Sequence, residues 1–257
     1  MHRHDELIKR VARYMQDVFG LVVFPAFQDD GPYPVDLPIA RYIDHTLLKA
    51  EATPEDIVQR CHEAVRYRFA SVCVHPGYVE MCAKHLIDSG IAVCTVVGFP
   101  LGATLNSVKV FEAREAIKRG ATEIDMVLAI GRLKAGQYHA VYDDIASVVL
   151  ACREQNTLCK VIIETSYLHD DEKVAACLLA ARAQAQFVKT STGYTNRGAT
   201  VHDVALMRRT VGPNVGVKAS GGVRTFEQAK QMIQAGATRI GSSSGISIVQ
   251  ESLTHSL

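Results

Sequence analysis

The sequence contains no tryptophan, no Cys-x-x-Cys pair and no His-Glu-x-x-His motif. Its seven cysteines are an odd number, and several sit inside apolar runs, as in Val72-Cys73-Val74. This pattern is typical of reduced thiols in a cytoplasmic protein, and it argues against a disulfide framework or a zinc site. The formal net charge is only +1, so we expect neither nucleic acid nor a membrane surface as a partner.

Long apolar segments are also absent. The longest uncharged stretch lies between Asp88 and Lys109, and three glycines, a proline and an asparagine interrupt it. We therefore expect no transmembrane helix. The N-terminal stretch has no uncharged apolar core, because Arg13 and Asp17 divide it, and this argues against a secretory signal.

Short apolar runs alternate with longer amphipathic segments from residue 41 onward. Apolar residues make up 48% of the chain, which is enough for a large core. The expected strands are 41–44, 70–74, 92–97, 123–128, 160–164, 186–190, 215–219 and 238–242. The expected helices are 54–67, 77–88, 104–118, 135–153, 170–182, 201–210, 225–235 and one from about 244. Gly90, Gly120 and Gly236 each follow a helix and precede a strand, where a left-handed residue is common.

Eight strands that are each followed by a helix predict an α/β fold, a (β/α)8 TIM barrel with an extra N-terminal helix. An open doubly wound sheet is the weaker alternative, because no G-x-G-x-x-G opens a helix after the first strand. Residues 5–19 carry a helical apolar stripe, and residues 28–38 are typical of a loop. We therefore divide the chain into an N-terminal helix with a linker, 1–40, and a barrel domain, 41–257. The stripe packs either on the barrel or on a second subunit.

Two lysines stand at the ends of two strands that are neighbours in the predicted barrel. Lys189 lies in 187-FVKTSTG-193 and Lys218 in 217-VKASGG-222. At about 6 Å and an effective dielectric of about 20, their ammonium groups repel by roughly 3 kcal/mol. Together with burial, that repulsion lowers the pKa of a lysine from about 10.4 toward 8, where part of it is a neutral amine. A neutral amine attacks carbonyl compounds and forms a Schiff base.

Carboxylates occupy other strands of the same barrel. Asp125 lies in the apolar run EIDMVL, where a charge must be paired, and beside two lysines it can shuttle protons as general acid and base. The alternative is that Asp125, Asp44 or Glu164 only balances the lysine charges. Lys160 and Glu164 lie on one side of the fifth strand, and we expect them to belong to a supporting ion-pair network.

Glycine and serine follow the seventh and eighth strands, in 220-SGGVRT-225 and 241-GSSSG-245. Glycine lets backbone N–H groups approach an anion, and a helix N-terminus attracts one. In barrels these two loops commonly bind phosphate, so we expect a phosphate site rather than two ordinary turns. Arg224 either adds charge to that site or pairs on the surface.

Eight segments of the chain resemble the deoxyribose-phosphate aldolase family, in the family's order and over about residues 40–250. They are 41-RYIDHTLLKAEAT-53, 71-SVCVHPGYV-79, 93-VCTVVGFPLGA-103, 123-EIDMVLAIGRLKAG-136, 160-KVIIET-165, 187-FVKTSTG-193, 217-VKASGGVRT-225 and 236-GATRIGSSSG-245. The resemblance implies a class I aldolase without metal or other cofactor. It implies reversible cleavage of 2-deoxyribose 5-phosphate to acetaldehyde and glyceraldehyde 3-phosphate.

The resemblance also implies roles for single residues. Lys189 would form the Schiff base, Lys218 would depress its pKa, and Asp125 would act with Lys218 in proton transfer. The implied substrate contacts are Asp44, Thr46, Cys73, Gly193, Gly221, Gly222, Val223, Arg224, Gly241, Ser243 and Ser244. At Cys73, an exposed thiol in the pocket would be open to alkylation by a reactive aldehyde.

Some positions depart from the family pattern. His75 stands where many members have asparagine, and Gln184 and Gln186 stand where glycine and aspartate are common. Asn196-Arg197 replaces a glycine-rich loop and would add charge near the phosphate.

The implied partners are phosphorylated sugars and aldehydes. Because the N-terminal helix resembles extensions that contribute to subunit contacts, we expect a homodimer or homotetramer. Two other functions stay open from the residues alone. One is a metal-independent sugar-phosphate isomerase with Asp125 as base and Lys218 as electrostatic stabiliser, and the other is a sugar-phosphate-binding barrel without catalysis.

Overall fold

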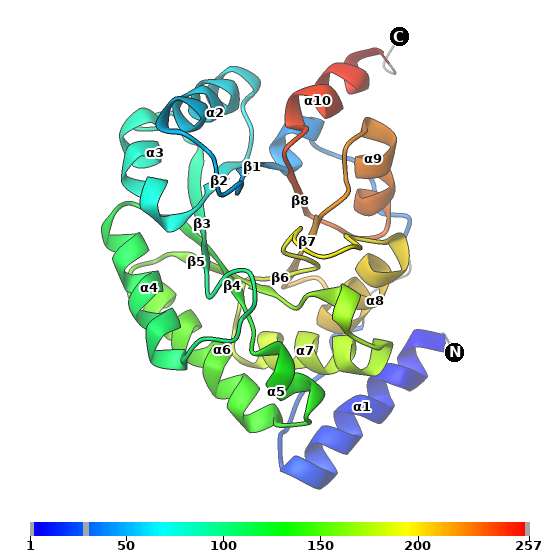
Figure 1. Cartoon of the computed structure of the whole chain (residues 1–257). Coiled ribbons are helices and arrows are strands. Elements are labelled where there is room, and N and C mark those ends of the chain that lie inside the picture. The colour runs from blue at the N-terminus through cyan, green and yellow to red at the C-terminus, as the bar shows by residue number, and fades with distance from the viewer. Residues whose placement is uncertain (1–2, 28–30, 255–257) are drawn as a thin grey trace.

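A computed structural model describes residues 3–27 and 31–254, and it shows a closed barrel of eight parallel strands in sequence order (Figure 1). The strands are β1 Ile43–Leu47, β2 Ser71–Val74, β3 Ala92–Val97, β4 Glu123–Val127, β5 Leu158–Ile162, β6 Phe187–Lys189, β7 Gly216–Ser220 and β8 Arg239–Ser242. The predicted fold class is therefore confirmed. The first strand was expected at 41–44 but begins two residues later, because residues 39–42 form a 3-10 turn.

Helices separate the strands and surround the barrel. They are α1 Arg3–Phe19, α2 Pro54–Tyr67, α3 Val79–His85, α4 Asn106–Lys118, α5 Ile130–Lys134, α6 Tyr138–Arg153, α7 Asp170–Arg182, α8 Val201–Val211, α9 Phe226–Gln234 and α10 Gly245–Thr254. The sequence TPED begins α2 sharply, because Thr53 and Asp56 form a reciprocal capping box and Pro54 occupies the first turn. One helix was expected over 135–153, but α5 precedes α6 and Gly136, at φ 67°, lies between them. Across residues 3–27 and 31–254, no helix combines the length and apolar character needed to cross a membrane.

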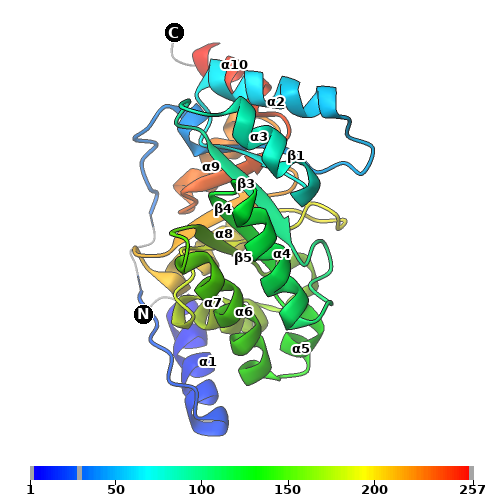
Figure 2. The same ribbon diagram turned by 90° about the vertical axis from the view of Figure 1, so that its left-hand side faces the viewer.

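The N-terminal helix packs on the outside of the barrel. Its apolar stripe buries Ile8 and Met15 completely, and α1 lies against α7, α8 and α6. Asp5 pairs with Arg209 of α8 at 2.8 Å, which adds a charged contact. Both ribbon views place α1 at the end of the molecule opposite α2 and α10 (Figures 1 and 2). Of the expected loop 28–38, residues 28–30 lie outside the described part of the chain, and 31–38 contain neither helix nor strand.

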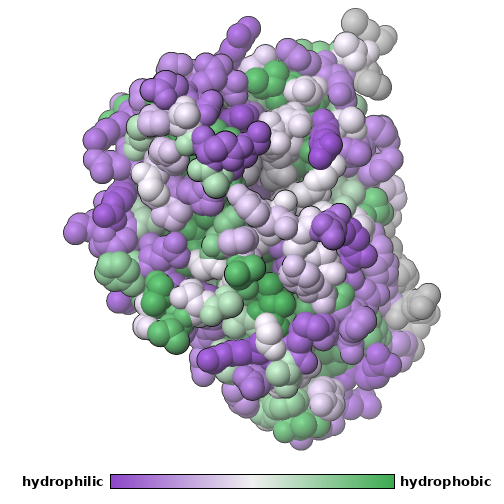
Figure 3. Space-filling model, viewed as in Figure 1, coloured by the Kyte–Doolittle hydropathy of each residue, from purple (hydrophilic) through white to green (hydrophobic). Residues whose placement is uncertain are grey.

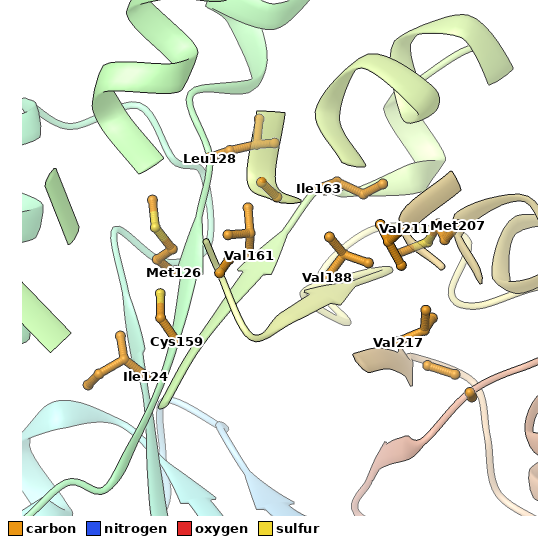
Figure 4. Close-up of a cluster of buried hydrophobic side chains, with 14 of the residues drawn as sticks. Ile124, Met126, Leu128, Cys159, Val161, Ile163, Val188, Met207, Val211 and Val217 are labelled. Atoms are coloured by element: carbon orange, nitrogen blue, oxygen red, sulfur yellow. The ribbon is translucent and has the colours of Figure 1, made fainter. Parts of the chain in front are cut away.

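Alternation along the strands separates an apolar layer from a charged one. On β4, Ile124 and Met126 belong to the apolar layer between the sheet and the helices, together with Val188 of β6 and Val217 of β7 (Figure 4). The residues between them face the barrel interior, because side chains alternate along a strand. Asp125 therefore points into the barrel interior, on the side of the sheet that faces away from the surrounding helices.

Candidate active site

Asp125 is the centre of the buried charge network. Its Oδ2 accepts hydrogen bonds from Lys189 Nζ at 2.8 Å and from Lys218 Nζ at 2.7 Å, and its Oδ1 accepts one from Lys160 Nζ at 2.7 Å. Because Lys189 and Lys218 bond the same oxygen, their two nitrogens cannot be farther apart than these two bond lengths together. The strand register explains this closeness, since Lys189 and Lys218 are direct partners on β6 and β7.

Asp44 is a second buried carboxylate in the network, and it pairs with Lys218. Lys218 Nζ lies 2.5 Å from its Oδ2, and Arg239 lies 2.5 Å from its Oδ1. The Ser71 hydroxyl also donates to Oδ1, at 2.6 Å. Glu123 completes the network by pairing with Lys160 at 2.6 Å. The lysines are therefore ion-paired with buried carboxylates, as the alternative interpretation expected. Such pairing is compatible with a catalytic role.

Burial and charge act in opposite directions on these groups. Burial alone raises the pKa of Asp125, but the lysines at Lys160, Lys189 and Lys218 outweigh it and hold that pKa well below its usual range. Burial lowers the pKa of Lys218, whereas Asp125 and Asp44 raise it, and the net shift is upward. Both shifts favour the charged forms, a carboxylate at Asp125 and an ammonium at Lys218.

A cavity of about 860 Å³ opens above the network at the carboxyl ends of the strands. Nine of the expected site residues line it: Thr46, Lys189, Gly193, Gly221, Gly222, Val223, Arg224, Gly241 and Ser243. Five do not: Asp44, Cys73, Asp125, Lys218 and Ser244. Of the three lysines that bond Asp125, Lys189 is the one at the cavity wall. Asp44 was expected to line the sugar pocket, but it is fully buried in the charge network.

The glycine-rich loops come together as expected for an anion site. A Cβ atom at Gly198 would lie 2.0 Å from the Gly221 carbonyl oxygen, so this close approach of two loops requires glycine. The Ser242 hydroxyl donates to Val223 O at 2.6 Å and links the loops after β7 and β8. The second loop leads directly into α10, whose N-terminus attracts negative charge.

Glu164 has a different role from the expected one. It does not pair with Lys160, because its backbone takes the left-handed conformation at φ 54° and turns the side chain away from the network. Its Oε2 accepts hydrogen bonds from the Thr192 backbone N–H at 3.0 Å and from the Thr192 hydroxyl. Glu164 therefore holds the loop that follows Lys189.

One further expectation is wrong. Cys73 is completely buried, so it is not an exposed thiol; its register partner on β3 is Cys94, which contacts Asp125. Arg197 is not among the residues that line the cavity, and it contacts Thr165 O at 3.3 Å and Asp203 at 3.6 Å, so its charge near the phosphate stays a prediction.

The departures at Gln184 and Gln186 have structural explanations. Gln184 has a φ of 64°, the left-handed conformation in which glycine is unstrained. Its side chain accepts a hydrogen bond from Arg153. Gln186 Oε1 accepts from the Cys159 backbone N–H at 2.8 Å and so joins β5 to the start of β6. His75 Nε2 lies 2.8 Å from Leu48 O at the rim of the barrel.

The groups that could hold a metal are already bonded to lysines. Asp125 with Cys73 and Cys94 is one such group, and its carboxylate is occupied by three ammonium groups. A surface group of Asp170, His202 and Asp203 was not foreseen, because its members meet only where α7 and α8 begin. There Lys173 contacts both aspartates, at 2.8 and 2.7 Å, in the place of a cation.

The sequence reasoning missed one side of the cavity. Residues of the β1–α2 connection and of α2 line that side. The lining residues there are Lys49, Ala50, Glu51, Ala52, Asp56, Gln59 and Arg60. The general placement of βα connections at the active face of a barrel is the signal that could have found them.

The fold and this cavity define a class: a (β/α)8 barrel with its site at the carboxyl ends of the strands. The DeoC/LacD family aldolase model matches residues 39–251. A deoxyribose-phosphate aldolase of Carboxydothermus hydrogenoformans is 58% identical over 214 residues, which are 82% of this chain and 94% of that protein. The chain therefore belongs to the DeoC/LacD family of aldolases, and the resemblance in its motifs is confirmed.

Solved structures agree with this assignment. A candidate deoxyribose-phosphate aldolase from Coccidioides immitis superimposes with a TM-score of 0.84 and 39% identity, over 97% of this chain and 96% of that one. The tetrameric deoxyribose phosphate aldolase from Aeropyrum pernix gives a TM-score of 0.79 and 33% identity, over 85% of this chain and 92% of its own.

Proposed function

We propose that this protein cleaves 2-deoxy-D-ribose 5-phosphate reversibly to acetaldehyde and D-glyceraldehyde 3-phosphate through a Schiff base on Lys189. The observation that carries the proposal is the position of this lysine. It lines the cavity, whereas Lys218 and Lys160, which bond the same carboxylate, do not. The names of the curated relatives support the substrate and the reaction.

The chemistry requires a neutral amine at Lys189. The network contains four cationic side chains and three carboxylates: Lys160, Lys189, Lys218, Arg239, Asp44, Glu123 and Asp125. One proton can therefore leave the network without creating a net negative charge.

The reaction then proceeds in balanced steps. The Lys189 nitrogen adds to the aldehyde carbon C1 of the open-chain sugar, and loss of water gives the imine. A base removes the proton of the C3 hydroxyl, the C2–C3 bond breaks toward the imine, and glyceraldehyde 3-phosphate leaves. Protonation of the enamine at C2 and hydrolysis of the imine release acetaldehyde.

We assign the proton transfers to Lys218 acting through Asp125. Asp125 is held ionised, so it is a poor general acid by itself, but its Oδ2 touches both Lys189 and Lys218. A proton can therefore pass between the two amines along one carboxylate oxygen. The phosphate would lie at the loops after β7 and β8, with Gly221, Gly222 and the N-terminus of α10 as its donors.

Trapping the imine tests this proposal. The protein is treated with acetaldehyde and borohydride and then digested for mass analysis, and we expect the reduced adduct on Lys189. Lys49 also lines the cavity and is well exposed, so Lys49→Arg is the matched control and should keep the adduct. A folded protein with no lysine adduct would contradict the proposal. The two alternatives would then be a sugar-phosphate isomerase and a non-catalytic binding barrel. Formation of an isomerised sugar phosphate would identify the isomerase.

We also propose a cytoplasmic homodimer or homotetramer, with residues 1–40 as a helix and linker attached to the barrel domain 41–257. The tetrameric relative from Aeropyrum pernix supports self-association. So do the exposed apolar side chains of α4, where Val108 and Phe111 are 45% and 67% exposed, and Figure 3 shows apolar atoms on that side of the surface. Light scattering on the purified chain measures the assembly, and a monomer would contradict it.

A further inference from the structure

Arg60 of α2 lines the catalytic cavity beside the two glycine-rich loops. Its Nη1 lies 3.3 Å from the backbone oxygen of Ser243, in the loop between β8 and α10. This contact joins two positions that are 183 residues apart in the chain. None of the motifs that indicate the function includes Arg60, so its place at the cavity comes from the tertiary structure alone.

The guanidinium of Arg60 is held in place from one side only. Nη1 lies 2.8 Å from His45 Nε2 and 3.4 Å from Glu63 Oε2, and with Ser243 O these are the contacts that the described residues make with it. Its Nε is buried without a hydrogen-bond partner. The side chain is 20% exposed and lines the cavity, so a ligand there can reach part of the guanidinium. The contacts above all use Nη1, which leaves Nη2 as a charged donor for such a ligand.

Phosphate is the ligand that matches these donors. The planar guanidinium presents parallel N–H groups that fit two oxygens of a phosphate, and its charge persists at every physiological pH. The neighbouring loops contribute backbone N–H groups and the N-terminus of α10, which favour the same anion. Arg224 lines the cavity too, but it is exposed, and its charge is more strongly screened by water.

We propose that Arg60 binds the phosphate of the substrate and makes the enzyme selective for phosphorylated over unphosphorylated sugars. This inference rests on the proposed function for the identity of the substrate. Glu63 and His45 act as positioning residues, because they contact Arg60 Nη1 and leave Nη2 to donate to the phosphate. Because one guanidinium gives charged hydrogen bonds, its removal should weaken phosphate recognition about 10-fold to 100-fold.

Steady-state kinetics of Arg60→Gln on two substrates test the proposal. With 2-deoxyribose 5-phosphate, we expect KM to rise by about 10-fold to 100-fold. With unphosphorylated 2-deoxyribose, we expect kcat/KM to stay within about 2-fold of the unsubstituted enzyme, because no phosphate contact is lost. For the phosphorylated sugar, the KM of Arg60→Lys should lie between the values of Arg60→Gln and of the unsubstituted enzyme. Arg66→Gln is the matched control, since Arg66 lies on the exposed face of the same helix, and it should leave the kinetics with both substrates unchanged.

An equal loss with both substrates would show that Arg60 supports only the fold and would overturn the proposal, as would an unchanged KM for the phosphorylated sugar. A calorimetric titration with inorganic phosphate keeps the test independent of turnover. Arg60→Gln should bind phosphate at least about 10-fold more weakly than the unsubstituted protein. If Lys189 forms no adduct with acetaldehyde but this difference in phosphate binding is found, the proposed lyase function fails while the phosphate role of Arg60 stands. If Arg60→Gln does not fold, the same titration with Arg60→Lys decides.

Discussion

His45 should make the stability of this protein depend on pH between neutral and mildly acid conditions. The side chain is completely buried behind β1, and its ring lies 4.6 Å from that of Phe69. Burial and the charge of Arg60 lower its pKa, and Glu63, at 2.7 Å from Nε2, raises it only partly. The resulting pKa of His45 is about 4, compared with about 6.5 in an unfolded chain.

The sign and size of the effect follow from these two values. Above pH 6.5 both states are neutral at His45, and the full stability is present. Below pH 6.5 the unfolded chain binds a proton that the folded protein refuses, so stability is lost as the pH falls toward 4. The loss from this one residue is about 2 kcal/mol at pH 5 and about 3 kcal/mol at pH 4.

Urea unfolding at pH 7.5 and pH 5 measures this loss. The low pKa of Asp125 contributes only when the pH falls below that of an unfolded aspartate, so pH 5 isolates the histidine. In His45→Gln the difference between the two pH values should be smaller by about 2 kcal/mol. His62→Gln, at an exposed histidine of the same helix as Arg60, should retain the full difference. Equal pH dependence in His45→Gln and the unsubstituted protein would refute the reasoning.

Three further predictions concern the network and one strained residue. Lys218→Met should slow imine formation on Lys189, because it removes the amine that shares the Asp125 oxygen and exchanges protons through it; the rate of borohydride trapping measures this, and an unchanged rate would contradict it. Asp125→Asn should lower kcat at least about 100-fold, because it removes the carboxylate bridge between the two amines, and a steady-state assay with normal kcat would oppose that role. Gln184→Gly should raise the free energy of unfolding in urea by up to about 1 kcal/mol, since glycine adopts the left-handed backbone of residue 184 without strain. A decrease in that free energy would show that the lost hydrogen bond from Arg153 matters more than the strain.

The barrel was predictable because its signals are local. Short apolar runs, three of them preceded by a glycine that follows a helix, specify strands and turns wherever the chain later places them. The capping sequence TPED begins α2 at the expected residue. The two strand lysines could be singled out for the same reason, since a lysine inside an apolar run needs an explanation even in a single strand. That the two glycine-rich loops meet was predictable because barrels place the loops after neighbouring strands beside each other.

Errors arose where contacts depend on how the barrel closes. In a regular strand the side chains of Glu164 and Lys160 would lie on the same side. The left-handed backbone of Glu164 instead directs its carboxylate to Thr192. Cys73 occupies a position that the resemblance assigns to the pocket, yet neighbouring side chains cover it completely. No pattern in the sequence reveals this burial, because residues packed around Cys73, such as Leu48, Cys94 and Phe99, come from other parts of the chain.

Local sequence patterns specify which residues form strands and which of them carry charge into the barrel, because a side-chain period of two is a property of the strand. Which charges meet depends instead on how the sheet closes. Asp125 and Lys218 are 93 residues apart in the chain and 2.7 Å apart in space, and that contact exists because closure of the sheet brings β4 and β7 to face the same interior. The same closure places Arg60 at the loop of Ser243, which local sequence cannot specify.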